Sequence, residues 1–192
     1  MNLLNLYNEL SLEDINDFVS TMQEENLTLD FKTINNANLA NKDDKRNLAK
    51  SLSAFANSSG GLVIWGVAAK KNKRGIDCAT GLKEIKDIRL FLSRLNEFTG
   101  MAVSPIVDDV RHRIIETSAN KGIAITYIPE SASGPHMAKM GEDRYYKRSG
   151  DSFYRLEHFD LEDMFGRRPR PKLEIYTRNG KIATPVSISI RD

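Results

Sequence analysis

The sequence predicts a protein of the α/β (α+β) class, in which helices pack against a mixed β-sheet and a β-hairpin forms the C-terminus. Three stretches of the 192-residue chain carry this prediction. The run LVIWGV at residues 62–67 is almost fully apolar and rich in β-formers, which is typical of a buried central strand. A helical repeat leads directly into this run, and residues 107–130 have the pattern of a two-stranded hairpin around 118–122.

A helix-capping pattern and an alternation of apolar and polar residues predict the N-terminal elements. Ser11 with Asp14 three positions later is typical of a helix start, and apolar residues then recur at helical spacing over about 12 residues. The stretch ENLTLDFK at residues 25–32 alternates apolar and polar residues, which predicts a strand. Asp30 and Lys32, two apart on that strand, then point the same way, about 6 to 7 Å apart.

The next helix is predicted within residues 41–61, with Asp43 and Asp44 in its first turn, where they suit the helix dipole, and with Asn57 to Gly61 as its stop. We expect Gly60 and Gly61 to be the left-handed residues that stop it. These glycines follow a helix and precede a strand, whereas a phosphate-binding loop precedes its helix, so ATP binding is not expected. Trp65, inside the apolar run, should be in the core with an internal partner for its indole N–H.

The second half of the chain alternates loops with short elements. We expect a polar, basic loop at 69–81, then a helix from about Ile85 to Leu95 that ends before Ser104-Pro105. A loop at 131–142 and a strand at 143–148 follow. The remaining predictions are a short helix capped by Asp160, an extended linker at 167–171 and a final hairpin at 172–190.

The composition argues against several classes of protein. The single cysteine, Cys78, permits neither a disulfide framework nor a thiolate zinc cluster within one chain. No apolar run reaches the length of a membrane span, and the N-terminus lacks the basic residues of a signal peptide, so we expect a cytoplasmic protein with no membrane partner. His112, His136 and His158 have no paired spacing, which favours structural roles over zinc binding; only His136 is kept as a candidate substrate contact.

Basic residues are concentrated locally, although the net charge is only +2. Residues 166–192 hold seven basic residues and two acidic ones, so the rest of the chain is slightly negative. A polyanion would therefore be held by local clusters. The candidate nucleic-acid contacts are Lys70, Lys71, Lys73, Arg74, Tyr146, Lys147 and Arg148. A tyrosine that faces solvent beside a cation suits an unpaired base, but each basic cluster taken alone is more often a solubilising surface.

Several of these motifs occur together in a known order. An acid, four residues and Asp-Phe-Lys are followed by a helix ending in AFANSSGG, the strand LVIWGV and, near the end, YYKRSG. This order resembles the Schlafen-type, AlbA-like nucleic-acid-binding domain over about residues 22–165. Residues 1–21 are then a helical lead-in, and 166–192 are a basic, proline-rich linker and hairpin outside the resemblance.

The resemblance implies a metal-dependent site. Some Schlafen proteins cut tRNA and rRNA with three carboxylates and a divalent metal, and two of those carboxylates belong to the stretch that here runs from Glu25 to Asp30. Glu25 and Asp30 are therefore implied as ligands of Mg²⁺ or Mn²⁺, with Lys32 beside them as a third catalytic residue that neutralises a phosphate oxygen. Taken alone, the acid-x-lysine pattern favours a salt bridge, so the sequence leaves both interpretations open.

One departure weakens the enzyme hypothesis. The third carboxylate of the family falls just after the glycine-rich strand, where this chain has Ala68 and Ala69. Asp77 or Glu24 is a candidate replacement, and the sequence leaves open whether Glu24 or Glu25 faces the site.

The resemblance also predicts the partners. We expect nucleic-acid binding, with RNA preferred over DNA and tRNA as a candidate, and a homodimer, because the family groove is built from two copies. Two function classes remain: a metal-dependent endoribonuclease, and a non-catalytic, DNA-binding module of a transcriptional regulator or an anti-phage defence protein. The strand-like end VSISIRD leaves open that the chain is part of a longer protein.

Overall fold

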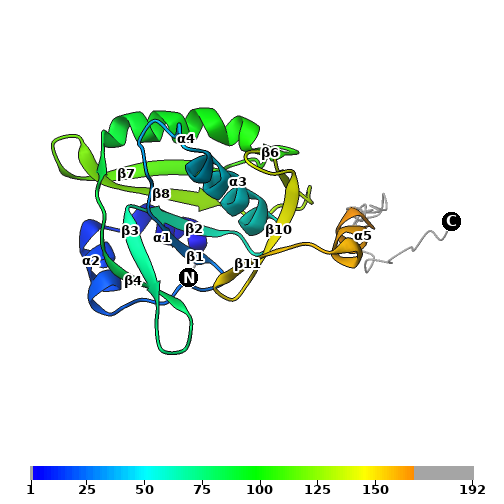
Figure 1. Cartoon of the computed structure of the whole chain (residues 1–192), viewed down its shortest axis with the longest axis horizontal. Helices are drawn as coiled ribbons and strands as arrows, with labels where there is room; N and C mark the ends of the chain where they lie inside the picture. Colours follow the sequence, from blue (N-terminus) through cyan, green and yellow to red (C-terminus); the bar gives the residue numbers. More distant parts are fainter. Residues whose placement is uncertain (1, 167–192) are drawn as a thin grey trace, which may run out of the picture.

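The computed structural model describes residues 2–166, so the predicted linker at 167–171 and the final hairpin lie outside the described residues. The helices of this part are α1 (Leu3–Glu9), α2 (Leu12–Ser20), α3 (Lys42–Ala56), α4 (Ile88–Ala102) and α5 (His158–Gly166). The strands are β1 (Leu29–Lys32), β2 (Gly61–Trp65), β3 (Val67–Lys71), β4 (Asp77–Leu82), β5 (Ile85–Lys86), β6 (Val103–Ser104), β7 (Arg111–Ser118), β8 (Lys121–Ile128), β9 (Met137–Ala138), β10 (Arg144–Ser149) and β11 (Ser152–Arg155). The predicted mixed α/β class is confirmed (Figure 1).

The central sheet is mixed. Its order is β1-β2-β8-β5, with β7 also paired to β8; β1 and β2 are parallel, and β2 and β8 are antiparallel. Every residue of β2 is buried. The predictions of a central strand here and of a hairpin over β7 and β8 are confirmed.

The apolar run is continuous because β2 is covered on both faces. Successive side chains of a strand point to opposite faces. Val63 and Trp65 belong to the core cluster that contains α3 and α4 residues, whereas Leu62 and Ile64 belong to the cluster formed with α1 and α2. Trp65 is fully buried, and its indole N–H donates to Thr126 Oγ1 at 2.8 Å, as predicted.

The N-terminal lead-in packs on the sheet. The Ser11–Asp14 cap of α2 is present as a reciprocal capping box, whereas α1 was not predicted. Tyr7 is buried, and its backbone carbonyl accepts a 2.7 Å hydrogen bond from Arg113 Nε on β7. The first helices therefore belong to the same folded body as the sheet.

Other sequence predictions need correction. Residues 69–81 are mostly the β3–β4 hairpin rather than a loop, because backbone pairing holds residues with weak β-propensity in strands. Helix α4 begins at Ile88, because Ile85 pairs in β5, and it ends at Ala102, just before Ser104-Pro105 as predicted. Gly60 has the expected left-handed φ of 69°, but Gly61 is the first residue of β2. A Cβ on Gly61 would lie 2.3 Å from the Phe55 ring, so close packing explains that glycine.

Candidate functional site

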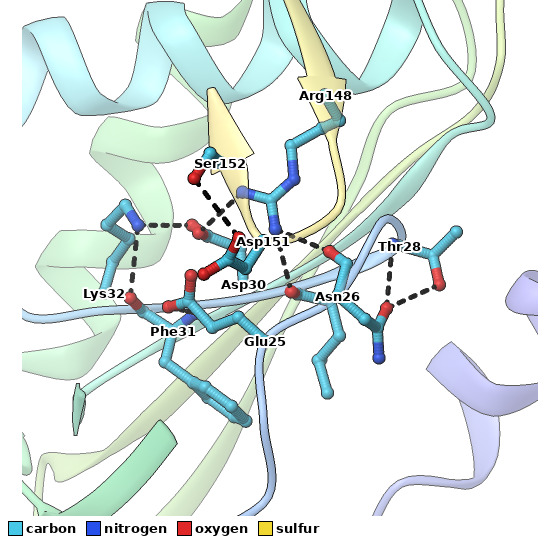
Figure 2. A network of polar contacts seen from close by, with 10 residues as sticks. Glu25, Asn26, Thr28, Asp30, Phe31, Lys32, Arg148, Asp151 and Ser152 are labelled. Carbon is cyan, nitrogen blue, oxygen red and sulfur yellow. Dashed lines mark hydrogen bonds and ion pairs between the residues drawn. The ribbon is translucent and has the colours of Figure 1, made fainter. Parts of the chain in front are cut away.

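A pocket of about 390 Å³ lies beside β1, and both Asp30 and Lys32 line it. The strand itself begins at Leu29, and the residues before it form a turn in which Asn26 and Leu29 exchange backbone hydrogen bonds. Glu25 therefore reaches the pocket from this turn rather than from the strand, which is shorter than the predicted 25–32 (Figure 2). We call it the acid–lysine pocket. The charged and aromatic residues in its wall are Glu25, Asp30, Phe31, Lys32, Asp77, Asp151 and Phe153.

Asp30 is fully buried between two cations. Lys32 Nζ lies 2.6 Å from its Oδ2, and Arg148 Nη1 donates to its Oδ1 at 3.1 Å. Arg148 also donates to the backbone carbonyls of Asn26 at 2.6 Å and Leu29 at 3.1 Å. The acid and the lysine are thus neighbours on one face, as predicted, but they form the salt bridge that the sequence left open.

Polar residues at the end of α3 position β10, which carries Arg148. Ser53 Oγ accepts from the Tyr146 N–H at 3.0 Å, and Ser58 Oγ accepts from the Arg148 N–H at 2.9 Å. Asn57 Nδ2 donates to the Tyr146 carbonyl at 2.9 Å. Ser53, Asn57 and Ser58, in the segment SAFANS at residues 53–58, therefore hold β10 against the helix.

Glu25 is a buried acid with a raised pKa. Its side chain is next to Asp30, and its Oε1 accepts a 3.1 Å hydrogen bond from the Phe31 N–H (Figure 2). Burial, and then the charge of Asp30, raise the pKa of Glu25 to about 8, although Lys32 acts in the opposite direction. Glu25 is accordingly protonated at neutral pH. Its neighbour Glu24 instead pairs with Arg74, which answers the question of which acid faces the pocket.

The carboxylates of the acid–lysine pocket, in the arrangement seen here, do not fit a divalent cation. Each oxygen of Asp30 already faces a cation, and Glu25 holds a proton at neutral pH. Within residues 2–166, no three His, Cys, Asp or Glu side chains are grouped so that they could hold a metal. Ala69 lines the pocket at the place of the missing third carboxylate, and Asp77 lines it from the neighbouring strand.

Three cations lie close to the ring of Phe153 in the wall of the pocket. Lys32 Nζ and Lys50 Nζ lie 5.3 Å and 5.1 Å from the centre of its ring, and the Arg148 guanidinium carbon lies 4.3 Å from it. Burial, followed by the charge of Lys32, lowers the pKa of Lys50. Lys50 and Phe153 were missed by sequence analysis, because a single lysine at a half-buried helix position gives no signal of its own.

The β3–β4 hairpin carries exposed lysines past the pocket. Lys70, Lys71 and Lys73 are exposed and form no ion pair with another described residue, whereas Arg74 pairs with Glu24. Lys71 is paired with Asp77, and residues opposite one another in an antiparallel pair share a face. Lys71 therefore lies on the face of the hairpin that reaches the pocket, and Lys70 on the other.

Of the other predicted contacts, three are buried and the fourth, Lys147, faces away from Arg148. Tyr146 and Arg148 are buried, at 3% and 2% exposure, so neither presents its side chain to solvent. Lys147 points to the opposite face of β10 from Arg148. His136 is fully buried, and its ring nitrogens contact the Pro105 carbonyl and Ser131 Oγ, each at 2.7 Å. The alternation of β10 turns residues 146 and 148 toward α3, which corrects their assignment as surface contacts.

Comparisons with known proteins agree with this fold. Residues 25–157 match the family model described as Schlafen, AlbA_2. The DIP2311 protein of Corynebacterium diphtheriae has a similar structure, with a TM-score of 0.50 and 16% identity over 89% of this chain and 35% of that one. This chain thus spans about a third of that protein, and the likeness shows the fold alone.

A second solved structure is the N-terminal domain of a Nitrosomonas europaea protein described as related to the ATP-dependent DNA helicase RecG. Its TM-score is 0.49 and its identity 21%, over 78% of this chain and 96% of that domain. No curated protein sequence matches this chain. Within residues 2–166, no helix has the length and apolar character needed to cross a membrane.

Proposed function

The chain belongs to the Schlafen AlbA_2 family, and from this premise we propose that it binds nucleic acid, RNA in preference to DNA, at the face that carries the acid–lysine pocket. The observation that carries the proposal is the set of lysines around this pocket. Lys32 and Lys50 flank Phe153, and Lys71 extends from the hairpin on the same side as Asp77. Lysines placed along a path neutralise successive phosphates, and this electrostatic attraction provides most of the affinity for a polyanion.

The composition of the pocket supports an unpaired nucleotide. Phe153 offers a half-buried ring for stacking, and carboxylates accept hydrogen bonds from the amino groups of bases. Duplex DNA keeps its bases stacked and paired, whereas folded RNA presents them in loops and ends. We therefore place a loop of RNA, with tRNA as the first candidate, on this face.

The first test compares binding of total tRNA and duplex DNA to the full chain over a range of salt concentrations. We expect tighter binding of tRNA and a steep loss of affinity as salt rises. Lys71→Glu should weaken tRNA binding about tenfold or more. Lys70→Glu is the matched control, since the neighbouring lysine carries the same charge on the other face of the hairpin, and its effect should be smaller.

The outcomes separate the parts of this proposal. Absence of tRNA binding at low salt would contradict the nucleic-acid function. Equal losses for the two lysine variants would contradict binding at the pocket face. Equal affinity for tRNA and duplex DNA would contradict the preference for RNA and favour the DNA-binding alternative.

A metal-dependent endoribonuclease is the second candidate. The observation in its favour is that Glu25, Asp30, Asp77 and Asp151 line one pocket, and it requires that a metal displace Lys32 from Asp30 and the proton from Glu25. Incubation of tRNA with the protein in Mn²⁺ or Mg²⁺, and separately in EDTA, tests it on a denaturing gel. A product that requires the metal and disappears in Asp30→Asn would establish cleavage, and intact tRNA in every lane would leave the binding function alone.

We also propose that two copies associate and that their basic faces line a shared channel. Helix α5 supports this, because none of its residues is buried and Phe159 and Phe165 are 80% and 62% exposed. A helix of nine residues is marginal by itself, and exposed aromatic residues are typical of an interface. Gel filtration with light scattering should give a dimer at micromolar concentration, and Phe159→Glu should weaken it. A monomeric wild type would refute this arrangement.

A further inference from the structure

A second basic depression lies next to the acid–lysine pocket. Its volume is about 590 Å³, and its lining consists of Ile34, Leu82, Lys83, Glu84, Lys86 and Lys121. We call it the three-lysine pocket. Sequence analysis assigned none of its residues to a function, because the lysines are separated by acids and apolar residues along the chain.

The lysines of this pocket outnumber its one acid, Glu84, by three to one. Lys83, Lys86 and Lys121 are all exposed, and none forms an ion pair with another residue in the described part of the chain. Lys86 and Lys121 are directly opposite each other in the pairing of β5 with β8. Like charges at opposite positions destabilise a sheet, so this pair repels until an anion lies between the two lysines. The arrangement is therefore suited to an anionic ligand.

The backbone fixes this group relative to the first pocket. The Gly66 N–H donates to the Lys32 carbonyl at 2.7 Å, and the Gly66 carbonyl accepts from the Lys83 N–H at 2.7 Å. One glycine thus joins a lysine of each pocket through two short hydrogen bonds. Thr33 lines the acid–lysine pocket, and the next residue, Ile34, lines the three-lysine pocket. The two depressions are neighbours along the segment that leaves β1.

We propose that a single nucleic-acid strand bound at the acid–lysine pocket continues past Thr33 and Ile34 into the three-lysine pocket, where Lys83, Lys86 and Lys121 bind its phosphates. This inference rests on the proposed function. The ligand class follows from the chemistry: exposed ammonium groups recognise charge without reading bases, and a phosphodiester backbone presents regularly spaced charges. The three-lysine pocket therefore adds affinity and length of footprint, with little sequence preference.

The test uses two single-stranded RNAs of one composition, about 6 and about 20 nucleotides long, so that only the longer one spans both pockets. The full chain is compared with Lys83→Ala/Lys86→Ala/Lys121→Ala by fluorescence anisotropy. The triple variant should bind the long RNA at least tenfold more weakly and the short RNA within twofold of wild type. For the long RNA, the salt slope of log K should fall by about 2, because three phosphate contacts are lost at about 0.7 each.

A matched variant and the wild type keep the outcomes distinct. Arg94→Ala/Arg111→Ala/Lys139→Ala removes the same charge from residues that line neither pocket, and it should retain the affinity of wild type for the long RNA. Equal losses for the two triple variants, or no loss for either, would overturn the inference while the proposed function stands. A wild type that binds neither RNA would overturn both.

Discussion

Two charged regions of this molecule differ in what surrounds them. Asp30 and Arg148 are both fully buried side chains that pair with each other, and Arg148 also donates to backbone carbonyls. The lysines of the β3–β4 hairpin are exposed and have no ion-pair partner among the described residues. Both regions contain basic residues that the sequence predicted as nucleic-acid contacts.

The difference shows how burial decides what a charge does. A buried ion pair must be complete, because removing one partner leaves an uncompensated charge out of water. An exposed lysine keeps its hydration, so its loss changes the stability of the fold little and its attraction for anions a great deal. Stability should therefore depend on the first region, and binding on the second.

The largest expected effect is the loss of Arg148. Arg148→Ala should lower the free energy of unfolding by about 3–5 kcal/mol, because Asp30 stays buried with Lys32 as its only cation. Chemical denaturation measures this. Lys147→Ala, one residue away on the other face of β10, is the control and should cost less than about 0.5 kcal/mol. Equal effects of the two variants would show that burial of Arg148 does not make it more important for stability than Lys147.

Asn57 should follow in size, because it holds the strand that carries Arg148. Its side chain donates to the His136 and Tyr146 carbonyls, both at 2.9 Å, and accepts from the His136 N–H at 2.7 Å. Asn57→Ala leaves these buried groups without a partner, so we expect a loss of about 2–4 kcal/mol in the free energy of unfolding. Asn96→Ala, on the exposed surface of α4, is the matched control. A change below 1 kcal/mol for Asn57→Ala would contradict its role.

Buried His112 should make the free energy of unfolding depend on pH. Its ring lies between Thr99 and Thr126, and burial lowers its pKa to about 4. Between pH 6.5 and 4 the unfolded chain binds a proton that the folded chain does not. The free energy of unfolding should therefore fall with falling pH in this window, by at most about 1.4 kcal/mol per pH unit. It should be unaffected by this group above pH 6.5.

Denaturation of His112→Asn at several pH values measures that contribution. The variant should show a shallower pH dependence between pH 6.5 and 4 than wild type. The exposed His158→Asn is the control and should follow the wild-type slope. A slope unchanged in His112→Asn would mean that other groups account for the acid sensitivity.

The smallest stability effect belongs to the hairpin. Lys70→Ala/Lys71→Ala/Lys73→Ala should change the free energy of unfolding by less than about 0.5 kcal/mol, because the lysines have no ion-pair partner among residues 2–166. The same variant should lower the affinity for tRNA more than any of the controls above. A hairpin variant that unfolds readily and still binds tRNA would reverse the assignment of the two regions.

Periodicity predicted the parts of the fold that are buried on a regular face. The run at β2, the helix α3 and the β7–β8 hairpin were all predicted, because each has a repeat that matches its burial. The β3–β4 hairpin was not predicted. Its residues have weak β-propensity, and its strands depend on pairing with each other and on packing against β1 and α2.

Only those residues of the candidate site that are close together in the sequence were predicted. Alternation placed Asp30 and Lys32 on one face, and the family resemblance added Glu25. The position of Arg148 depends on a contact 118 residues away in the chain, so no local pattern distinguishes it from the half-buried Lys147. Lys50 and Phe153 meet Lys32 through the same long-range packing of β11 against α3.

The same separation sets a lower limit on what must be synthesised before the fold is complete. Asp30 leaves the ribosome 118 residues before Arg148. At roughly 5–20 residues per second, the carboxylate waits about 6–24 s for its guanidinium. A nascent chain that ends before β10 thus contains β1 and β2 but not the charge that lets Asp30 be buried. Closure of the sheet around this acid is a late event, after most of the domain has been translated.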